Sequence, residues 1–167
     1  MSYKVLKAID VELNTQSIRR AIRDLEYFQT ELEVKCWELV QVLTMEGAEI
    51  AKMQVVSMDA FDTGELESSI QGMFFPEERC GFVIAEAPHA IYVEYGTGIV
   101  GQSFPHPEAE GNYEYDVNQH GAKGWVYKSD RDGKFHWTKG YVSRPFMYNT
   151  LRWLEETAPD MASEILT

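Results

Sequence analysis

Apolar residues recur at steps of three and four along the first third of the chain. They are Ile18, Ile22, Leu25, Phe28, Leu32, Cys36, Leu39, Leu43, Ile50 and Met53. This spacing predicts an amphipathic helix over residues 15–58, capped by Asn14 or Thr15. Such a helix is roughly 60 Å long, which exceeds the width of a compact domain of this size. We expect it either to bend at Gly47 around the sheet or to project from the body and pack against another copy.

A different pattern begins after residue 60. Asp62 and Glu65 have the spacing of a capping box, and Leu66 and Ile70 mark the inward side of the short helix that such a box starts. Residues 72–87 are then typical of an antiparallel hairpin, because β-branched and aromatic residues flank the turn-like segment PEERCG.

A second hairpin is predicted at residues 125–139, with Asp132 and Gly133 at its turn. Aromatic side chains in its two strands can form cross-strand pairs. They are Trp125, Tyr127, Phe135 and Trp137.

The segment between the two hairpins is less regular. Residues 87–98 fit either a strand or a short helix, and Pro88 near the start and Gly96 at the end favour the helix. Residues 99–124 are rich in glycine, and their acids do not alternate with apolar residues. We expect a long loop there, of the kind that is usually functional or disordered.

A last helix is predicted to begin at residues 143–145 and to end before Pro159, since proline interrupts the interior of a helix. Its apolar side consists of Phe146, Met147, Leu151 and Leu154.

These elements predict one α+β domain over residues 1–167. It has a long N-terminal helix, a small antiparallel sheet of hairpins, short helices and a C-terminal helix. A segment of residues 1–14 precedes the long helix, the α+β body covers residues 59–158, and residues 159–167 form a tail.

The charge of the chain is concentrated in its middle third. The chain carries 27 acidic and 15 basic residues, a formal net charge of −12. Residues 59–116 hold twelve acids and one base, net −11, against −2 for residues 1–58 and +1 for residues 117–167. An acidic surface repels nucleic-acid phosphate. We interpret it as a solvated face kept for solubility, as a surface that meets a basic partner, or as the lining of a passage where sticking must be avoided.

Composition suits a folded domain: 44% of the 167 residues are apolar and 13% are aromatic. The chain has no uncharged apolar run of membrane-spanning length, and its first residues lack the apolar stretch of a secretory signal. We therefore expect no membrane association and a start in the cytoplasm. Cys36 and Cys80 fit no metal-binding spacing, so we expect two reduced thiols.

Two patterns suggest cofactor chemistry. Residues 96–101 match the GxGxxG fingerprint, but Pro105 and Pro107 exclude the helix that must follow it to hold a pyrophosphate. We expect these glycines to end a helix and open the loop. Four potential metal ligands share that loop without the spacing of a known catalytic site: His106, Glu108, Asp116 and His120. We expect the loop histidines to be exposed polar residues.

The chain offers little for covalent or acid–base catalysis. It contains no GxSxG, no active-site cysteine neighbourhood and no P-loop. Glu65 and Glu67 are two residues apart on a predicted helix, so they point to different sides and complement the helix dipole instead of forming a pair. We expect a protein that is not an enzyme and holds no cofactor or metal.

Three segments carry a resemblance to a known family. DTGELESSI, APHAIYVEYGTG and RPFMYNTL occur in this order at residues 62–70, 87–98 and 144–151. In order and rough spacing the chain resembles the minor neck or tail-component proteins of long-tailed lambdoid-type bacteriophages. That family acts at the head–tail connection and in tail completion.

The resemblance covers most of residues 15–155. The matching positions, which we take as candidates for interaction, are Asp62, Thr63, Gly64, Leu66, Ser69, Ile70, Ala90, Tyr92, Val93, Glu94, Tyr95, Gly96, Thr97, Gly98, Arg144, Pro145 and Phe146. The chain departs from the family at His89, where many relatives carry tyrosine, and its 124–140 insert is similar to a longer-looped branch.

The resemblance implies a structural virion protein at the phage head–tail junction or tail end. It implies a homo-oligomeric ring that contacts other neck and tail proteins and is assembled in the host cytoplasm. Genomic DNA would then meet the ring only while passing through its lumen. The acidic stretch of residues 59–116 would line that lumen. Two alternatives stay open: a metal-dependent hydrolase or nuclease that uses the His106–His120 loop, and a cytoplasmic binding module with an acidic face.

Overall fold

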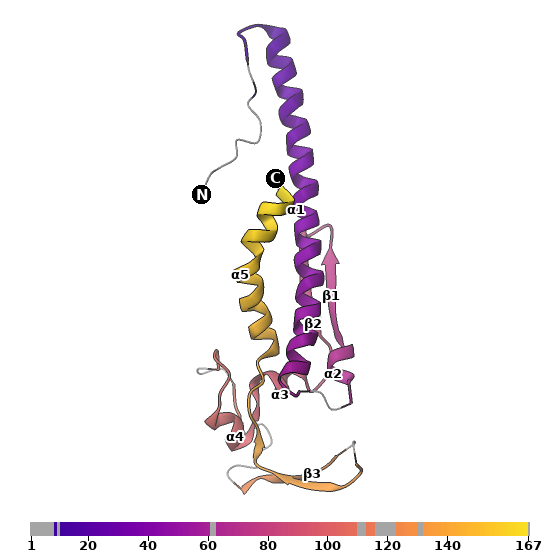
Figure 1. Cartoon of the computed structure of the whole chain (residues 1–167), viewed down its shortest axis with the longest axis vertical. Coiled ribbons are helices and arrows are strands. Elements are labelled where there is room, and N and C mark those ends of the chain that lie inside the picture. Colours follow the sequence, from indigo (N-terminus) through magenta and orange to yellow (C-terminus); the bar gives the residue numbers. More distant parts are fainter. Residues whose placement is uncertain are drawn as a thin grey trace.

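The fold is elongated and is organised around one long helix, α1 (Thr15–Ser57) (Figure 1). Helix α5 (Phe146–Leu166) lies along one side of α1, and the hairpin of β1 (Ile70–Phe75) and β2 (Cys80–Ala85) lies along the other. The hairpin of β3 (Trp125–Lys128) and β4 (Phe135–Thr138) forms the base. The α+β class predicted from the sequence is confirmed. This computed structural model describes residues 9, 11–60, 63–109, 113–115, 123–129 and 132–166.

Helix α1 spans Thr15–Ser57, within one residue of its predicted end. Asn14 caps it as expected, because its side-chain oxygen accepts a hydrogen bond from the backbone N–H of Ser17 at 2.8 Å. The helix continues through Gly47 without ending. A Cβ atom at Gly47 would lie 2.9 Å from Cγ2 of Val83, so this glycine serves close packing against the hairpin.

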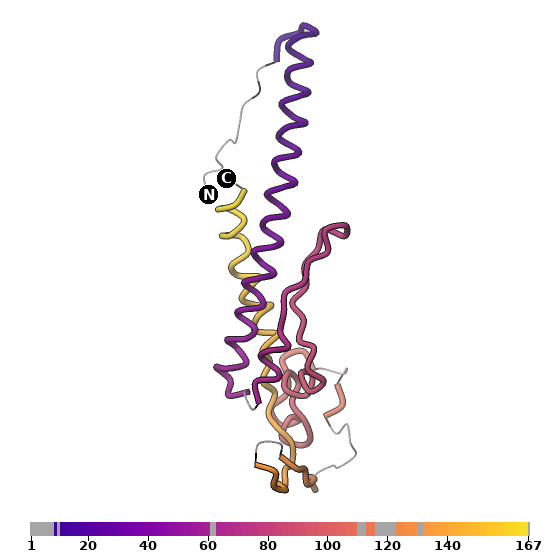
Figure 2. Tube along the Cα trace, turned by 90° about the vertical axis from the view of Figure 1, so that its right-hand side faces the viewer, coloured from indigo at the N-terminus to yellow at the C-terminus, as the bar shows by residue number. Residues whose placement is uncertain are grey.

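The N-terminal half of α1 extends beyond the rest of the described fold (Figure 2). The tip of the β1–β2 hairpin reaches it at Glu33, whose carboxylate lies 3.8 Å from the guanidinium of Arg79. We call residues 15–32 the projecting segment. Of the two arrangements that the helix length allowed, the structure therefore has the projecting one.

The first hairpin is formed by β1 (Ile70–Phe75) and β2 (Cys80–Ala85), which pair antiparallel from Ile70 opposite Ala85 to Phe75 opposite Cys80. This confirms the predicted hairpin. Both cysteines of the chain are free thiols.

Helix α2 is a single turn, Glu65–Ser68, and begins differently from the prediction. Its N-cap is Gly64, in a left-handed conformation with φ of 83°, and no side chain caps it. The predicted capping box is therefore wrong, because Glu65 is the first residue of the helix and not the third. Ile70 begins a strand instead of continuing the helix, and Asp62 lies outside the described residues.

The core lies where α1 meets the hairpin, the short helices and α5. Small side chains of α1 let these elements approach closely, and larger ones from the other elements fill the space. The buried cluster consists of Ala48, Ala51, Val55, Leu66, Ile70, Ala87, Ala90 and Phe146.

Helix α5 spans Phe146–Leu166 and runs antiparallel to α1, with the Asn149 side-chain amide 3.4 Å from the Gln54 side-chain oxygen. The prediction that it ends before Pro159 is wrong, because the helix continues through this proline. Its half-buried residues keep a three-to-four spacing on both sides of the proline, from Leu154 to Ile165. Packing along this stripe offsets the one backbone hydrogen bond that proline removes.

Two short helices follow β2. Helix α3 covers Ala90–Tyr95, as predicted, and ends at Gly96 with φ of 79°. Helix α4 covers Gly98–Ser103, so the predicted loop over residues 99–124 is wrong at its start. The tight succession of Gly96 and Gly98, both with positive φ, allows the chain to end one helix and begin another within two residues.

The base consists of β3 (Trp125–Lys128), β4 (Phe135–Thr138) and the two-residue β5 (Gly140–Tyr141). The hairpin is as predicted, but the aromatic pairing is not. Val126 lies opposite Trp137 and Lys128 opposite Phe135. Because directly opposed residues share a face, Trp125 and Tyr127 lie on one face and Phe135 and Trp137 on the other. None of the helices that the structure describes has the length and apolar character to span a membrane.

Candidate functional site

The three segments that carry the family resemblance meet at one place in the fold. Leu66 and Ile70 of the first segment, Ala90 of the second and Phe146 of the third belong to the same buried cluster. Because their side chains are enclosed, these four positions stabilise the fold and are not exposed to a partner. We call the place where the second and third segments join, at the start of α5, the motif junction.

Glu94 is the centre of the motif junction. It projects from α3 and is 8% exposed. Its Oε2 atom accepts a hydrogen bond from the backbone N–H of Met147, and its Oε1 atom accepts one from the N–H of Tyr148, each at 2.9 Å. These are the second and third residues of α5, so a carboxylate from another helix caps α5.

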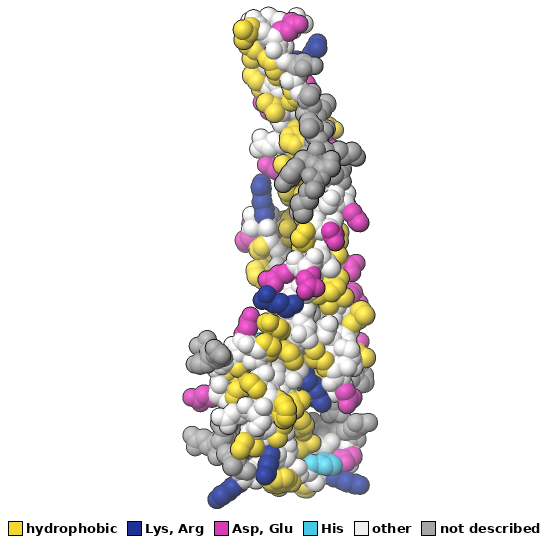
Figure 3. Space-filling view, turned by 60° about the vertical axis from the view of Figure 1, so that its left-hand side comes forward, with side chains coloured by type: hydrophobic (Ala, Val, Ile, Leu, Met, Phe, Trp, Pro, Cys, Tyr) yellow, Lys and Arg dark blue, Asp and Glu magenta, His cyan; other side chains and the backbone are white. Residues whose placement is uncertain are grey.

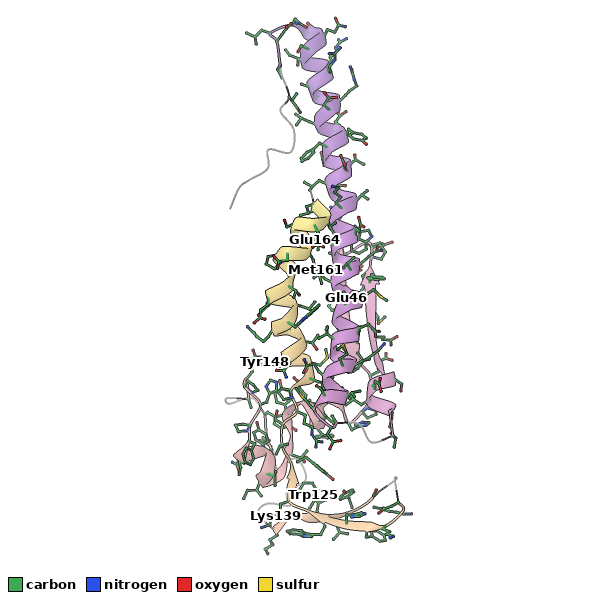
Figure 4. All side chains as sticks on the ribbon, in the orientation of Figure 1. Glu46, Trp125, Lys139, Tyr148, Met161 and Glu164 are labelled. Atoms are coloured by element: carbon green, nitrogen blue, oxygen red, sulfur yellow. The ribbon has the colours of Figure 1, made fainter. Side chains whose placement is uncertain are left out.

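The local sequence explains why α5 needs an outside cap. Pro145 immediately precedes the helix, and its side chain has no hydrogen-bond acceptor. The free amides at the start of α5 are therefore satisfied by Glu94, whose negative charge also suits the positive end of the helix dipole. Figure 4 labels Tyr148 at this end of α5.

Backbone contacts join the same two segments. The N–H of Arg144 donates to the carbonyl of Val93 at 2.9 Å, and the Ser143 hydroxyl donates to the carbonyl of Glu94 at 2.6 Å. Gly96 lies so close to the incoming strand that a Cβ atom there would stand 2.7 Å from the Tyr141 carbonyl oxygen. Position 96 therefore requires glycine for two reasons: a side chain would clash with the backbone there, and the positive φ disfavours other residues.

Thr97 and Gly98 extend the junction to the base. They form isolated antiparallel bridges with Tyr141 and Gly140, and the Thr97 hydroxyl accepts a hydrogen bond from the Tyr141 N–H at 3.2 Å. The structure therefore assigns structural contacts to most of the second segment.

His106 completes the junction, and sequence reasoning missed this role. It is 4% exposed, so the expectation of an exposed polar residue is wrong for it. Its Nδ1 atom accepts a hydrogen bond from the Glu108 N–H at 3.0 Å, which places the ring proton on Nε2. That Nε2 lies 3.0 Å from Oε1 of Glu94 and donates to it.

This geometry bears on the metal-site hypothesis. Both ring nitrogens of His106 are already engaged, so a metal ion would have to displace Glu94 or the Glu108 amide. The other two candidate ligands, Asp116 and His120, lie outside the described residues. Within the part of the chain that is described, no three His, Cys, Asp or Glu side chains are grouped to hold a metal.

Aromatic rings surround the buried pair. Tyr95 packs on the His106 ring with centroids 4.4 Å apart, and Tyr148 meets it edge-on at 5.4 Å. Tyr113 stacks on Tyr95 at 4.6 Å, and its hydroxyl donates to the Gly96 carbonyl at 2.9 Å. The Tyr115 hydroxyl accepts a hydrogen bond from the backbone N–H of His106 at 3.0 Å. Residues 113–115 are therefore anchored to the junction.

Tyr113 has a perturbed acidity. Its pKa is raised from the ordinary value of 10.0, first by burial and then by repulsion from the neighbouring Tyr92, Tyr115 and Tyr95 hydroxyls in their ionised form. The phenol is thus held in its neutral, hydrogen-bond-donating state.

A polar cavity of about 970 Å³ separates α2 and α3 from the β3–β4 hairpin. Two exposed pairs line it: His89 Nδ1 lies 4.0 Å from Glu65, and His136 Nε2 lies 2.9 Å from Asp132. The pKa of Asp132 is lowered, mainly by the hydrogen bond from the Lys134 N–H and further by His136. Both pairs are exposed to solvent in a wide cavity. We therefore interpret them as surface ionic contacts and not as a site for acid–base catalysis.

Among the described residues, the acids of the middle third do not form one continuous surface. Glu77 and Glu78 lie at the turn of the β1–β2 hairpin, whereas Glu65 and Glu67 lie on α2 at the other end of that hairpin. Glu94 is buried and contributes no surface charge.

Two groups of neighbouring exposed apolar side chains occur on the elements that the structure describes. The first, which we call the helix stripe, runs along the projecting segment and consists of Ile18, Ile22, Leu25, Phe28 and Leu32. The second, which we call the hairpin face, lies on the outer side of β3–β4 and consists of Val126, Phe135 and Trp137. Apolar groups gathered in this way mark interaction surfaces. Figure 3 shows hydrophobic side chains along the projecting segment and Lys and Arg side chains around the base.

Comparison with known proteins identifies no relative. No protein-family model matches the chain, and neither a curated protein nor a solved structure matches it. The motif junction and the two exposed apolar surfaces are therefore the features of the described fold that bear on function.

Proposed function

We propose that this chain is a structural virion protein at the head–tail junction or tail end of a long-tailed bacteriophage. In this role it assembles as a homo-oligomeric ring and contacts other neck and tail proteins. The observation that carries the proposal is the projecting segment of α1, whose apolar stripe has no described element of its own chain packed over it.

The stripe is costly to leave in water. Each of its five large side chains is more than a third exposed, and burying an apolar side chain contributes about 1.5–3 kcal/mol. A helix that extends beyond its own core in this way is stabilised when another protein surface covers it. An assembly protein has such neighbours, because each subunit is surrounded by copies of itself and by the layers above and below.

The motif junction fits the same role. Glu94 and His106 satisfy one another and the start of α5, so their polar atoms are used to hold α3, α5 and the base in a defined arrangement. A body that is rigid at this point presents its projecting helix and its base at a constant relative position. Such a constant geometry is what repeated contacts in a ring require.

The acidic middle third completes the proposal. In a ring whose lumen faces the β1–β2 hairpin, the exposed acids at the two ends of that hairpin would repel passing DNA from the wall. A ring structure in which these acids lie mostly on the outer rim would remove this part of the proposal.

Electron microscopy of particles from infected cells tests the proposal. When the gene is deleted, filled heads should lie apart from finished tails, and a plasmid-borne wild-type copy should restore whole virions. Complementation with Leu25→Asp, which places a charge in the helix stripe, should fail, while Val34→Asp on the opposite side of α1 should succeed. Normal virions in the absence of the protein would exclude the proposed role.

A further inference from the structure

The two exposed apolar surfaces lie at opposite ends of the molecule. The helix stripe is on the projecting segment of α1, and the hairpin face is on the base, where Figure 4 labels Trp125 and Lys139. Leu25, at the centre of the stripe, is 55% exposed, and Trp137, at the centre of the hairpin face, is 60% exposed. One copy of the chain cannot bring these two surfaces together, because the body separates them.

Acidic residues flank the helix stripe. At 100° per residue around the helix axis, Asp24 and Glu26 lie on either side of the line through Leu25. By the same spacing, Arg20 and Arg23 lie toward the opposite side of the helix. Glu31 lies beside Asp24, and Arg19 lies about 20° beyond Glu26. The stripe is therefore an apolar line with an acidic border on the Asp24 side and a mixed border on the Glu26 side.

Lysines border the hairpin face. Lys128 lies directly opposite Phe135 on the same side of the hairpin as Trp137. The Lys139 ammonium lies 5.6 Å from the centre of the Trp137 ring. The hairpin face is therefore an apolar patch with a basic border, the charge complement of the helix stripe.

We propose that the hairpin face of one copy docks on the helix stripe of the next copy. Trp137 and Phe135 then cover the stripe around Leu25, and Lys128 and Lys139 meet the acids that border it. The contact supplies the subunit interface of the homo-oligomeric assembly put forward above, and it rests on that proposed function.

Charge decides against the simplest competing contact, in which two helix stripes pair with each other. Such pairing would set two copies of the same surface, each carrying Asp24 and Glu26, against each other, where like charges are unfavourable. Docking on the hairpin face replaces this repulsion with attraction. It also uses two different surfaces, so every copy both offers a hairpin and accepts one, and such head-to-tail contacts close into a ring or continue as a filament.

Sedimentation velocity of purified full-length variants tests the contact. Leu25→Asp disables the stripe and Trp137→Glu disables the hairpin face. Each variant alone should stay monomeric, with the dissociation constant raised about tenfold or more over the wild type. A mixture of the two should form a one-to-one dimer and nothing larger, because one intact stripe and one intact hairpin face remain.

Matched variants control for folding and for charge. Val34→Asp lies on the opposite side of α1 and is 63% exposed in the wild type, so it should associate normally. Circular dichroism should show the same helix content in every variant. The pair Lys128→Glu and Lys139→Glu should weaken association, and mixing that double variant with Asp24→Lys, Glu26→Lys should restore it.

Two results would overturn the contact. Association of Trp137→Glu alone at wild-type strength would indicate that stripes pair with each other, and a wild-type protein that stays monomeric at hundreds of micromolar would exclude self-docking. Either result can coexist with separated heads and tails in the deletion phage, which would leave the virion role standing. If the deletion phage forms normal virions while the mixed variants form a one-to-one dimer, the subunit contact is supported and the role at the head–tail junction is excluded.

Discussion

The Nε2 atom of His106 lies 3.0 Å from the Oε1 atom of Glu94, and both side chains are buried. Two residues twelve positions apart thereby satisfy each other, and Glu94 also caps α5 through the N–H of Met147, which lies 53 positions later in the chain. A buried carboxylate is stable only when its oxygens are hydrogen-bonded, so this pair depends on α5 as much as α5 depends on it.

Replacement of Glu94 by glutamine should destabilise the fold. Glutamine keeps the size but has one acceptor oxygen in place of two, and its NH2 group would face a donor N–H at the start of α5. The free energy of unfolding should fall by about 2–4 kcal/mol in urea titrations. Glu46→Gln, an exposed carboxylate on α1, should change it by less than about 0.5 kcal/mol. Equal effects at the two positions would contradict the role of Glu94.

His106→Ala should likewise lower the free energy of unfolding by about 2–4 kcal/mol, because it leaves a cavity and an unpaired Glu108 amide. His136→Ala removes an exposed ring and should cost less than about 1 kcal/mol. Thermal unfolding of the wild type with and without EDTA distinguishes the structural role of His106 from a metal-binding role. A melting temperature that falls in EDTA, together with a stoichiometric metal in the purified protein, would favour the metal-site alternative.

Gly140 and Gly133 form a matched pair for testing the base. Both have positive φ, at 109° and 68°, so alanine is strained at either one. A Cβ atom at Gly140 would collide with the Thr97 carbonyl oxygen, whereas nothing lies within 4 Å at Gly133. Gly133→Ala should cost about 1 kcal/mol and Gly140→Ala about 3 kcal/mol or more, measured by chemical unfolding. Similar costs would mean that Gly140 does not lie against Thr97 and Gly98 as described.

Tyr113 should make stability depend on alkaline pH. Its pKa is raised in the folded state, chiefly by burial, so the folded protein holds this proton more tightly than the unfolded chain does. The resulting stabilisation is fully present below the unfolded pKa and is lost as pH rises past about 10. Urea unfolding between about pH 9 and pH 11 should therefore show a steeper loss for the wild type than for Tyr113→Phe. Tyr27→Phe, at an exposed tyrosine of α1, should retain the wild-type slope.

Periodic elements were predictable, because their signals are local. Steps of three and four residues located α1 to within one residue of its end, and β-branched and aromatic residues on either side of turn residues located both hairpins. The helical assignment of residues 90–95 followed from the proline and glycine at its two ends.

The incorrect predictions concern strand register and helix length, which depend on contacts with other parts of the chain. The strands of the second hairpin were found, but their register places odd-numbered residues opposite even-numbered ones, so the four aromatic side chains divide between two faces. Pro159 signals a helix end in isolation, yet packing against α1 carries α5 through it. The Gly98–Ser103 helix is too short to show a periodic pattern in the sequence.

The sequence by itself determined most of the helical and extended segments, since backbone preference and apolar spacing act within a few residues of each position. Only the tertiary structure decided that Glu94 and His106 are buried partners, that no other described element covers the helix stripe, and that Lys128 and Trp137 share a face. These relationships depend on which distant segments meet, and the free energy of those contacts is distributed over the whole core and is not encoded in any one stretch of chain.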